Sequence, residues 1–211
     1  MRRTLTISAC LAALLAAGAP ARAQGVSSAT TGIFFRAGFS LTVLDPSALA
    51  FTAARSREAR RLSMPQSFSG KQLGWSREAL PGASLGVALD ARWFYLRIGA
   101  ELYPAPTITV QPDRYRADVI TVGWAALGPR FAWDRFAVHA GARVGAVVMG
   151  LRSGNGGLEY SAVTGIYAAE VGFQWRPLRW LSVDAAVSQD FSSLAATTVT
   201  VAASFGWSRR P

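Results

Sequence analysis

The chain has 211 residues, with 22 basic against 12 acidic residues, one cysteine and one histidine. Such a basic chain could bind nucleic acid, but it has a single lysine and no helix-turn-helix, zinc-finger or RNA-binding motif. We therefore expect no nucleic-acid partner, and one cysteine excludes an internal disulfide.

The first 23 residues have the features of a secretory signal peptide. Met1-Arg2-Arg3 is basic, Leu11 to Ala17 is apolar, and Ala21-Arg22-Ala23 is a small-x-small cleavage site. The apolar run is too short to span a bilayer as a helix. It follows Cys10 instead of preceding it, which argues against a lipoprotein site. Cleavage leaves one predicted domain, residues 24–211, with 19 basic against 12 acidic residues and no cysteine.

Apolar residues alternate along most of the mature chain, and a period of two is typical of a β-strand. The clearest example runs from Trp93 to Tyr103, where apolar residues at every second position alternate with a set that includes Arg97 and Glu101. The pattern predicts eight strands, at residues 32–43, 84–91, 93–103, 118–131, 136–148, 161–175, 180–188 and 197–207.

The fourth predicted strand breaks the pattern. Ile120, Val122 and Trp124 share one face, whereas Leu127 and Phe131 fall on the other. We expect a β-bulge near Ala125-Ala126 to bring all five onto one face.

The connections between the strands alternate between long and short. The three short turns, at 90–92, 133–135 and 176–179, are the second, fourth and sixth connections and therefore lie at one end of a meander. The first connection is a long basic loop at about 44–82, in which 48–62 could form either a short amphipathic helix or a mobile loop. Its basic residues are Arg55, Arg57, Arg60, Arg61, Lys71 and Arg77.

Charges on the polar faces are few and are interleaved with glycine, which suits a small closed lumen with the apolar faces turned to lipid. Strands of roughly 9–11 residues cross the hydrocarbon when tilted, and closure pairs every backbone group. The sequence thus predicts an all-β fold, an eight-stranded antiparallel up-and-down transmembrane β-barrel. Tryptophans near the short turns form a predicted aromatic girdle, which comprises Trp93, Trp133, Trp175, Trp180 and Trp207.

In this pattern the chain resembles the eight-stranded outer-membrane barrels of the OmpA-like and OmpX/Ail-like class, within the wider porin family. The resemblance implies the outer membrane of a Gram-negative cell envelope and recognition by the barrel-assembly machinery. The last strand matches that assembly signal, with Val201, Ala203, Phe205 and Trp207 at alternate positions. It departs from the family pattern because Ser208 to Pro211 follow the aromatic residue. We expect the protein to lack the peptidoglycan-anchoring module of full-length OmpA-type proteins.

Charged residues on the predicted inward faces form a candidate lumen charge network. In the structural interpretation they pair with one another and fill a narrow interior; in the functional one they gate an ion or proton path. The network comprises Arg36, Asp90, Arg97, Glu101, Arg143, Glu170 and Asp184, with Arg130 and His139 as further candidates. Breaking such a pair would leave a buried charge uncompensated.

His139 is the only histidine, so a histidine-dependent enzyme would have to use it. Lipid A acylases and deacylases are also eight-stranded barrels, but no His-x-Ser arrangement is present here. One histidine and no mature cysteine make a metal site unfavourable. We expect no catalytic residues, no metal and no cofactor.

These observations favour a monomeric outer-membrane barrel with a structural or surface-interaction role and a charge-filled lumen, not a large pore. Its expected partners are outer-membrane lipid, lipopolysaccharide and an external partner bound through the long basic loop. The alternatives are a narrow channel or small-ligand barrel, a lipid A modifying enzyme, and a secreted soluble barrel of lipocalin type whose apolar faces line a cavity.

Overall fold

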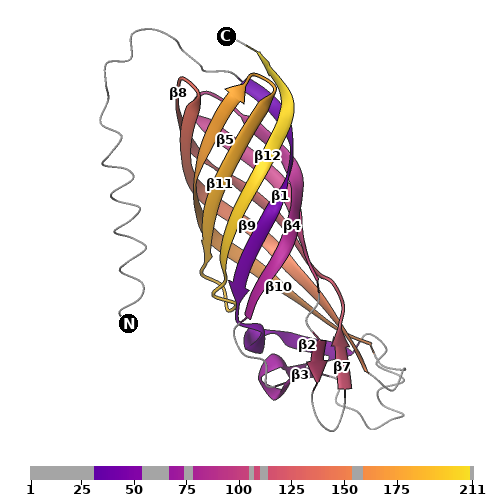
Figure 1. Ribbon diagram of the computed structural model, residues 1–211. Coiled ribbons are helices and arrows are strands. Elements are labelled where there is room, and N and C mark those ends of the chain that lie inside the picture. Colours follow the sequence, from indigo (N-terminus) through magenta and orange to yellow (C-terminus); the bar gives the residue numbers. More distant parts are fainter. Residues whose placement is uncertain are drawn as a thin grey trace.

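Eight antiparallel strands close into a barrel in the computed structural model, which describes residues 31–53, 67–73, 78–104, 107–109, 114–153 and 159–209 (Figure 1). Around the barrel the strand order is β10-β11-β12-β1-β4-β5-β8-β9, and β9 pairs with β10 to close the ring. The all-β, eight-stranded antiparallel fold is therefore confirmed. The strands are β1 (Thr31–Leu44), β4 (Glu78–Asp90), β5 (Phe94–Tyr103), β8 (Ile120–Trp133), β9 (Phe136–Ser153), β10 (Glu159–Leu178), β11 (Leu181–Asp190) and β12 (Thr197–Arg209).

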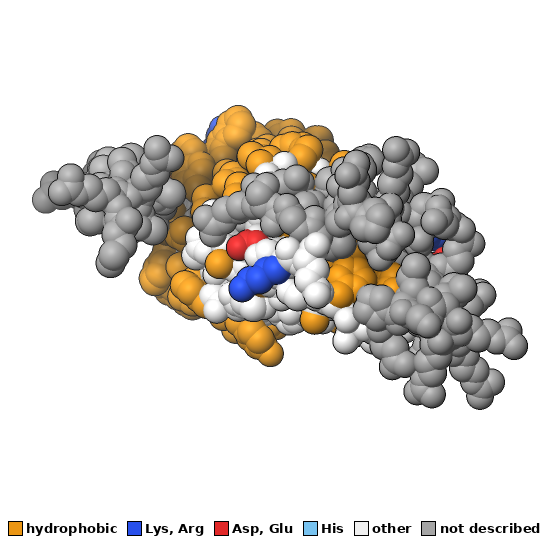
Figure 2. All heavy atoms as spheres, turned by 90° about the horizontal axis from the view of Figure 1, so that it is seen from below, with side chains coloured by type: hydrophobic (Ala, Val, Ile, Leu, Met, Phe, Trp, Pro, Cys, Tyr) orange, Lys and Arg blue, Asp and Glu red, His pale blue; other side chains and the backbone are white. Residues whose placement is uncertain are grey.

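The barrel wall is apolar on the outside. Along β1 burial alternates strictly from Thr31 to Ala37, with Ile33 and Phe35 exposed and Phe34 and Arg36 buried. Every other barrel strand carries exposed apolar residues in the same way, because successive side chains point to opposite faces of the sheet. Seen from the end of the long connections, hydrophobic side chains lie around the outside (Figure 2). Large exposed members include Phe39, Leu85, Ile98, Leu127, Val144, Val163, Tyr167, Phe173, Val201 and Phe205.

The three short connections are tight turns at the same end of the barrel. Residues 91–93 join β4 to β5, residues 134–135 join β8 to β9, and residues 179–180 join β10 to β11. Asp134 has a φ of 47°, a left-handed conformation that aspartate tolerates better than most residues. The third turn was predicted at 176–179, but β10 continues to Leu178 with a register shift after Trp175, so the prediction was three residues early at its start.

The opposite end carries a sheet that projects beyond the barrel (Figure 1). β9 and β10 are 18 and 20 residues long, whereas β5 has 10. Four short strands pair outward from the far ends of β9 and β10, in the order β3-β2-β10 on one side and β9-β7-β6 on the other. They are β2 (Ala50–Ala53), β3 (Ser67–Ser69), β6 (Thr107–Thr109) and β7 (Arg114–Ala117).

The fourth barrel strand, β8, contains no bulge, so this prediction was wrong. Its pairing with β5 is unbroken from Phe94↔Pro129 to Tyr103↔Ile120, and its register with β9 stays constant. Ile120, Val122 and Trp124 therefore face inward and are at most 4% exposed, while Leu127 faces outward at 61%. Both faces of this part of β8 are apolar because Ile120 and Val122 line the apolar half of the interior, while the Trp124 ring packs against Arg143.

The long connection after β1 is shorter and more structured than predicted. β4 begins at Glu78, so the connection spans 45–77 instead of about 44–82. Within it lie two 3-10 turns, η1 (Pro46–Ala48) and η2 (Gly70–Leu73), as well as β2 and β3. Ala50–Ala53 is a strand, not the start of a helix, and the rest of the proposed helix lies outside the described residues, as does the predicted signal peptide. Among the residues that are described, no helix is long and apolar enough to cross a membrane.

Candidate functional site

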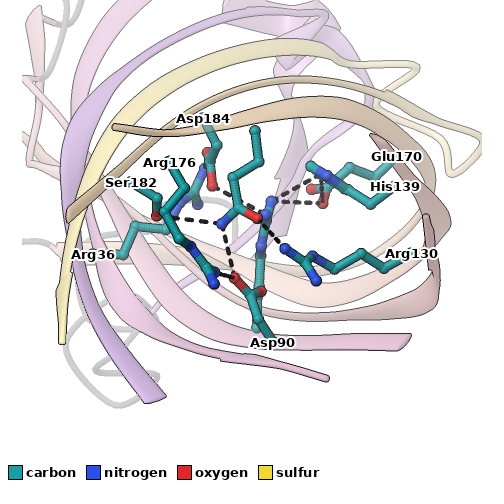
Figure 3. A network of polar contacts seen from close by, with 10 residues as sticks. Arg36, Asp90, Arg130, His139, Glu170, Arg176, Ser182 and Asp184 are labelled. Carbon is teal, nitrogen blue, oxygen red and sulfur yellow. Dashed lines mark hydrogen bonds and ion pairs between the residues drawn. The ribbon is translucent and has the colours of Figure 1, made fainter. Parts of the chain in front are cut away.

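A buried network of charged side chains fills the barrel interior toward the short turns (Figure 3). Asp184 on β11 lies at its centre and binds two arginines, Arg36 on β1 at 2.6 Å and Arg97 on β5 at 3.0 Å. Arg97 also lies 3.7 Å from Glu170 on β10. These four side chains are at most 4% exposed, so each charge is compensated by a neighbour and not by solvent.

His139 on β9 belongs to the same network. Its Nε2 atom is 2.9 Å from Nη1 of Arg97, and because a guanidinium can only donate, Nε2 accepts this hydrogen bond. Glu170 lies 3.7 Å from the same nitrogen, and the ring packs edge-on against Tyr95. A Cβ atom at Gly172 would collide with the imidazole, so this glycine provides the room that the histidine occupies.

A second group of polar contacts lies closest to the short turns and is built around Asp90 at the end of β4. Gln174 and Arg176 on β10 each donate to Oδ2 of Asp90 at 2.8 Å. The side-chain oxygen of Gln174 accepts from Arg130 at 2.8 Å, and its nitrogen lies 3.3 Å from Ser182. Residues from four different strands are thus tied together across the lumen.

A third group lies deeper in the barrel, between the charged part of the interior and the part near the long connections. Arg143 on β9 pairs with Glu101 on β5 at 2.8 Å and stacks over the Trp124 ring, with its guanidinium carbon 4.5 Å from the ring centre. Tyr103 donates to Glu101 at 2.8 Å, so its oxygen accepts the 2.6 Å bond from Thr42. The Glu101 carboxylate therefore binds both a guanidinium and a phenol.

The structure places all seven residues of the predicted charge network inside the barrel, together with Arg130 and His139, and each is at most 5% exposed. Six of the seven meet in two groups, Arg36–Asp184–Arg97–Glu170 and Glu101–Arg143. Asp90 instead pairs with Arg176, which the sequence reading had assigned to a turn. The inward position of Trp124 was also missed, although Trp124 lies at even spacing from Arg130 on the same strand.

The interior near the long connections is apolar. Side chains from β8, β9 and β10 meet there with residues of the first connection, and Phe51 of β2 is fully buried. A small cavity of about 20 Å³, with room for about one water molecule, lies where the two halves meet and is lined by residues that include Tyr103, Val122, Arg143, Ile166 and Leu194. The buried apolar residues include Leu44, Leu49, Phe51, Leu80, Ile120, Val122, Val147, Met149, Leu151 and Tyr160.

The predicted surface residues lie in three places. The five tryptophans of the aromatic girdle are exposed near the short turns, from 43% for Trp175 to 81% for Trp207. On β12 the predicted assembly-signal residues Val201, Phe205 and Trp207 are exposed, and Ala203 is half-buried on the same face. Of the basic-loop residues only Lys71 is described, exposed in η2; Arg55, Arg57, Arg60, Arg61 and Arg77 lie outside the described residues.

Among the described residues, no group of three or more histidine, cysteine, aspartate or glutamate side chains is placed to hold a metal ion. The charged side chains of the lumen pair with one another across the barrel. The network therefore fills the interior.

The chain matches no family model, and no curated protein matches it in sequence. Solved structures do share its fold. One is Ail, the attachment invasion locus protein of Yersinia pestis, with a TM-score of 0.53 and 10% identity over 84% of this chain and 99% of that one. A second structure, Ail in complex with the heparin analogue sucrose octasulfate, has a TM-score of 0.51 and 12% identity over 85% of this chain and 99% of that one. Neisserial surface protein A, NspA, has a TM-score of 0.51 and 8% identity over 83% of this chain and 97% of that one. At these identities the likeness shows a shared eight-stranded barrel fold.

Proposed function

We propose that this chain is a transmembrane barrel of the Gram-negative outer membrane with a structural or surface-interaction role. The observation that carries the proposal is the reversed polarity of the barrel: the outside is apolar all round, whereas the most deeply buried residues include Arg97 and His139. A soluble protein rarely exposes so large a continuous apolar surface, but lipid requires one. A closed ring also leaves no unpaired strand edge inside the bilayer.

A role as a large pore is disfavoured by the way the lumen is filled. Arg36, Arg97 and Asp184 bridge β1, β5 and β11 across the interior at 2.6–3.0 Å. An eight-stranded barrel has room only for side chains or one small ligand. His139 is held by Arg97, Glu170 and Tyr95, so its surroundings are those of a packed interior residue and support a non-enzymatic protein.

Surface interaction is supported by the end that carries the long connections. The projecting sheet extends from β9 and β10, which are far longer than the roughly 9–11 residues that a tilted strand needs to cross the hydrocarbon. The sequence adjoining this sheet is rich in arginine, which binds phosphate and sulfate groups well. Ail is named for attachment and has been solved with a heparin analogue. We extend that chemistry to this chain as a proposal: its basic first connection binds anionic groups outside the cell.

The test uses the full chain folded into phosphatidylcholine vesicles and sucrose octasulfate as the probe. We expect binding by the native chain, and a substantial loss in the Arg55→Gln/Arg57→Gln/Arg60→Gln variant. The matched control, Arg92→Gln/Arg135→Gln/Arg179→Gln, removes the same charge from the opposite end and should bind as the native chain does. Equal binding by all three proteins, or no binding by any, would contradict the polyanion-binding part of the proposal.

The water-sized cavity beside Arg143 favours a second candidate, a barrel that conducts ions weakly. It lies where the charged and apolar halves of the interior meet, and its lining includes both Glu101 and Ile166. Single-channel recording in planar bilayers separates the two functions. A closed structural barrel gives no discrete conductance, whereas steps that change in the Arg143→Met variant would support a conducting path.

A further inference from the structure

Each of the three short turns presents one arginine and one tryptophan at the surface. The first has Arg92 and Trp93, the second Trp133 and Arg135, and the third Arg179 and Trp180; we call these six residues the short-turn rim. All six are exposed, the tryptophans by 61%, 46% and 53%. The Arg92 guanidinium lies 4.9 Å from the centre of the Trp93 ring. The same pair of residue types therefore recurs at three points around one end of the barrel.

The positive charge of the rim is largely uncompensated. Asp134 is the only acidic residue in the three turns, and none of the three rim arginines forms an ion pair with a carboxylate of the described residues. Nearby Asp90 is buried and is bound by Arg176 and Gln174.

The opposite end of the barrel differs. There the exposed Arg152 lies 3.2 Å from Asp118 and 3.8 Å from Glu159, so its charge is offset. Among the described residues, the three rim arginines have no such carboxylate partner.

Hydrogen bonds hold each turn of the rim against its neighbour. The carbonyl of Trp93 accepts from the Arg130 amide at 2.9 Å, and the carbonyl of Arg135 accepts from the Arg176 amide at 2.7 Å. The carbonyls of Arg179 and Trp180 accept from Ser208 and Gly206 of β12, at 3.1 and 3.0 Å. The backbone that carries the arginines is therefore held in place, which lowers the conformational entropy lost when a ligand binds.

We propose that the short-turn rim binds the headgroups of anionic phospholipids of the phosphatidylglycerol type in the leaflet that surrounds it. The inference rests on the proposed function, because it requires the barrel to sit in a bilayer. A guanidinium contacts a phosphate through two parallel hydrogen bonds, and an indole ring sits between headgroups and hydrocarbon. Arginine beside tryptophan thus matches a phosphate at the depth where anionic lipids carry it.

The experiment measures lipid preference by tryptophan quenching. The full chain is folded into vesicles of phosphatidylcholine and phosphatidylglycerol in which one lipid or the other is brominated, at equal mole fractions. The rim tryptophans are exposed, so we expect adjacent brominated chains to quench them, whereas Trp124 is buried inside the barrel at 4% exposure. Flotation of the protein with pure phosphatidylcholine vesicles first establishes that the barrel is inserted.

Two variants with the same change in charge make the comparison local. Arg92→Gln/Arg179→Gln alters the rim, and Lys71→Gln/Arg152→Gln alters exposed residues at the other end. We expect the native chain to prefer brominated phosphatidylglycerol at low salt, and the preference to weaken at high salt. Each rim arginine that is removed should lower the binding constant for phosphatidylglycerol relative to phosphatidylcholine by up to about fivefold. The control should keep the native preference.

Two results would overturn the inference while leaving the proposed function intact. One is an inserted native barrel with no preference between the two lipids. The other is an equal loss in both double variants, which would reflect net charge and not the rim. Failure to float with phosphatidylcholine vesicles would instead contradict the proposed function, and the inference with it.

Discussion

The two halves of the barrel interior are filled in different ways. Toward the short turns, arginines and carboxylates such as Arg97 and Asp184 cross the lumen in ion pairs. Toward the long connections, the interior positions hold apolar side chains such as Ile120 and Met149, which join the core of the first connection. The difference shows that inward-facing need not mean polar in this barrel. Only the charged half contrasts with the lipid-facing wall.

That contrast determines in which half the removal of one side chain lowers the free energy of unfolding more. A charge left alone in the lumen keeps its full desolvation cost, whereas a missing methyl group leaves a cavity. The following substitutions sharpen the comparison, and all are measured as the free energy of unfolding in urea in the same lipid vesicles.

Removal of Asp184 should have the largest effect. Asp184→Ala leaves Arg36 and Arg97 without their shared partner, and breaking a buried pair typically costs about 3–5 kcal/mol. Asp134→Asn is the control, since this residue is exposed in a turn at a φ that asparagine also adopts. A cost for Asp184→Ala no greater than for the control would mean that solvent, and not the ion pairs, stabilises these arginines.

Truncation in the apolar half should come next. Ile120 is fully buried in the apolar core, and Ile120→Ala should cost about 2–4 kcal/mol through lost contacts and the cavity that remains. Leu127→Ala lies on the same strand but faces outward at 61% exposure, where lipid can fill the space. We expect it to cost less than half as much. Comparable costs would show that the interior of this half is loosely packed.

The junction between the halves should show the smallest effect. Tyr103→Phe removes the hydroxyl that donates to Glu101 and accepts from Thr42, which should cost about 1–2 kcal/mol. Tyr167→Phe, at 65% exposure on the outer wall, is its control and should be within about 0.5 kcal/mol of the native chain. If the two variants were equally stable, the hydrogen bonds at the junction would contribute little to stability.

The sequence predicts the fold well wherever the two faces of a strand differ. On β1 and β9 the inward arginines and glycines contrast with outward phenylalanine and valine, and the orientation of these strands follows from that contrast. The strand order follows from the alternation of long and short connections. The prediction fails on β8, where Ile120 and Val122 face the apolar half of the interior, Trp124 faces Arg143, and no periodicity separates inside from outside. The predicted β-bulge assumed that all apolar residues of this strand lie on one face, but the strand is apolar on both faces.

The candidate site was predictable as a set of residues but not as a set of partners. Even spacing identifies Arg36, Arg97 and Asp184 as inward, yet the stagger of strands around the barrel decides which of them meet. The projecting sheet was not predictable for a similar reason. Its strands β2 and β7 have four residues each and are held by pairing with β10 and β9, not by a pattern of their own.

The central claim is that a closed barrel turns its apolar face to lipid, and a gel comparison of unboiled and boiled protein from the outer-membrane fraction tests it most directly. A closed transmembrane barrel resists SDS until it is heated, so we predict that the unboiled protein migrates at a different position from the boiled protein. A protein found free in the periplasm, with the same mobility before and after boiling, would contradict the claim and favour a soluble barrel.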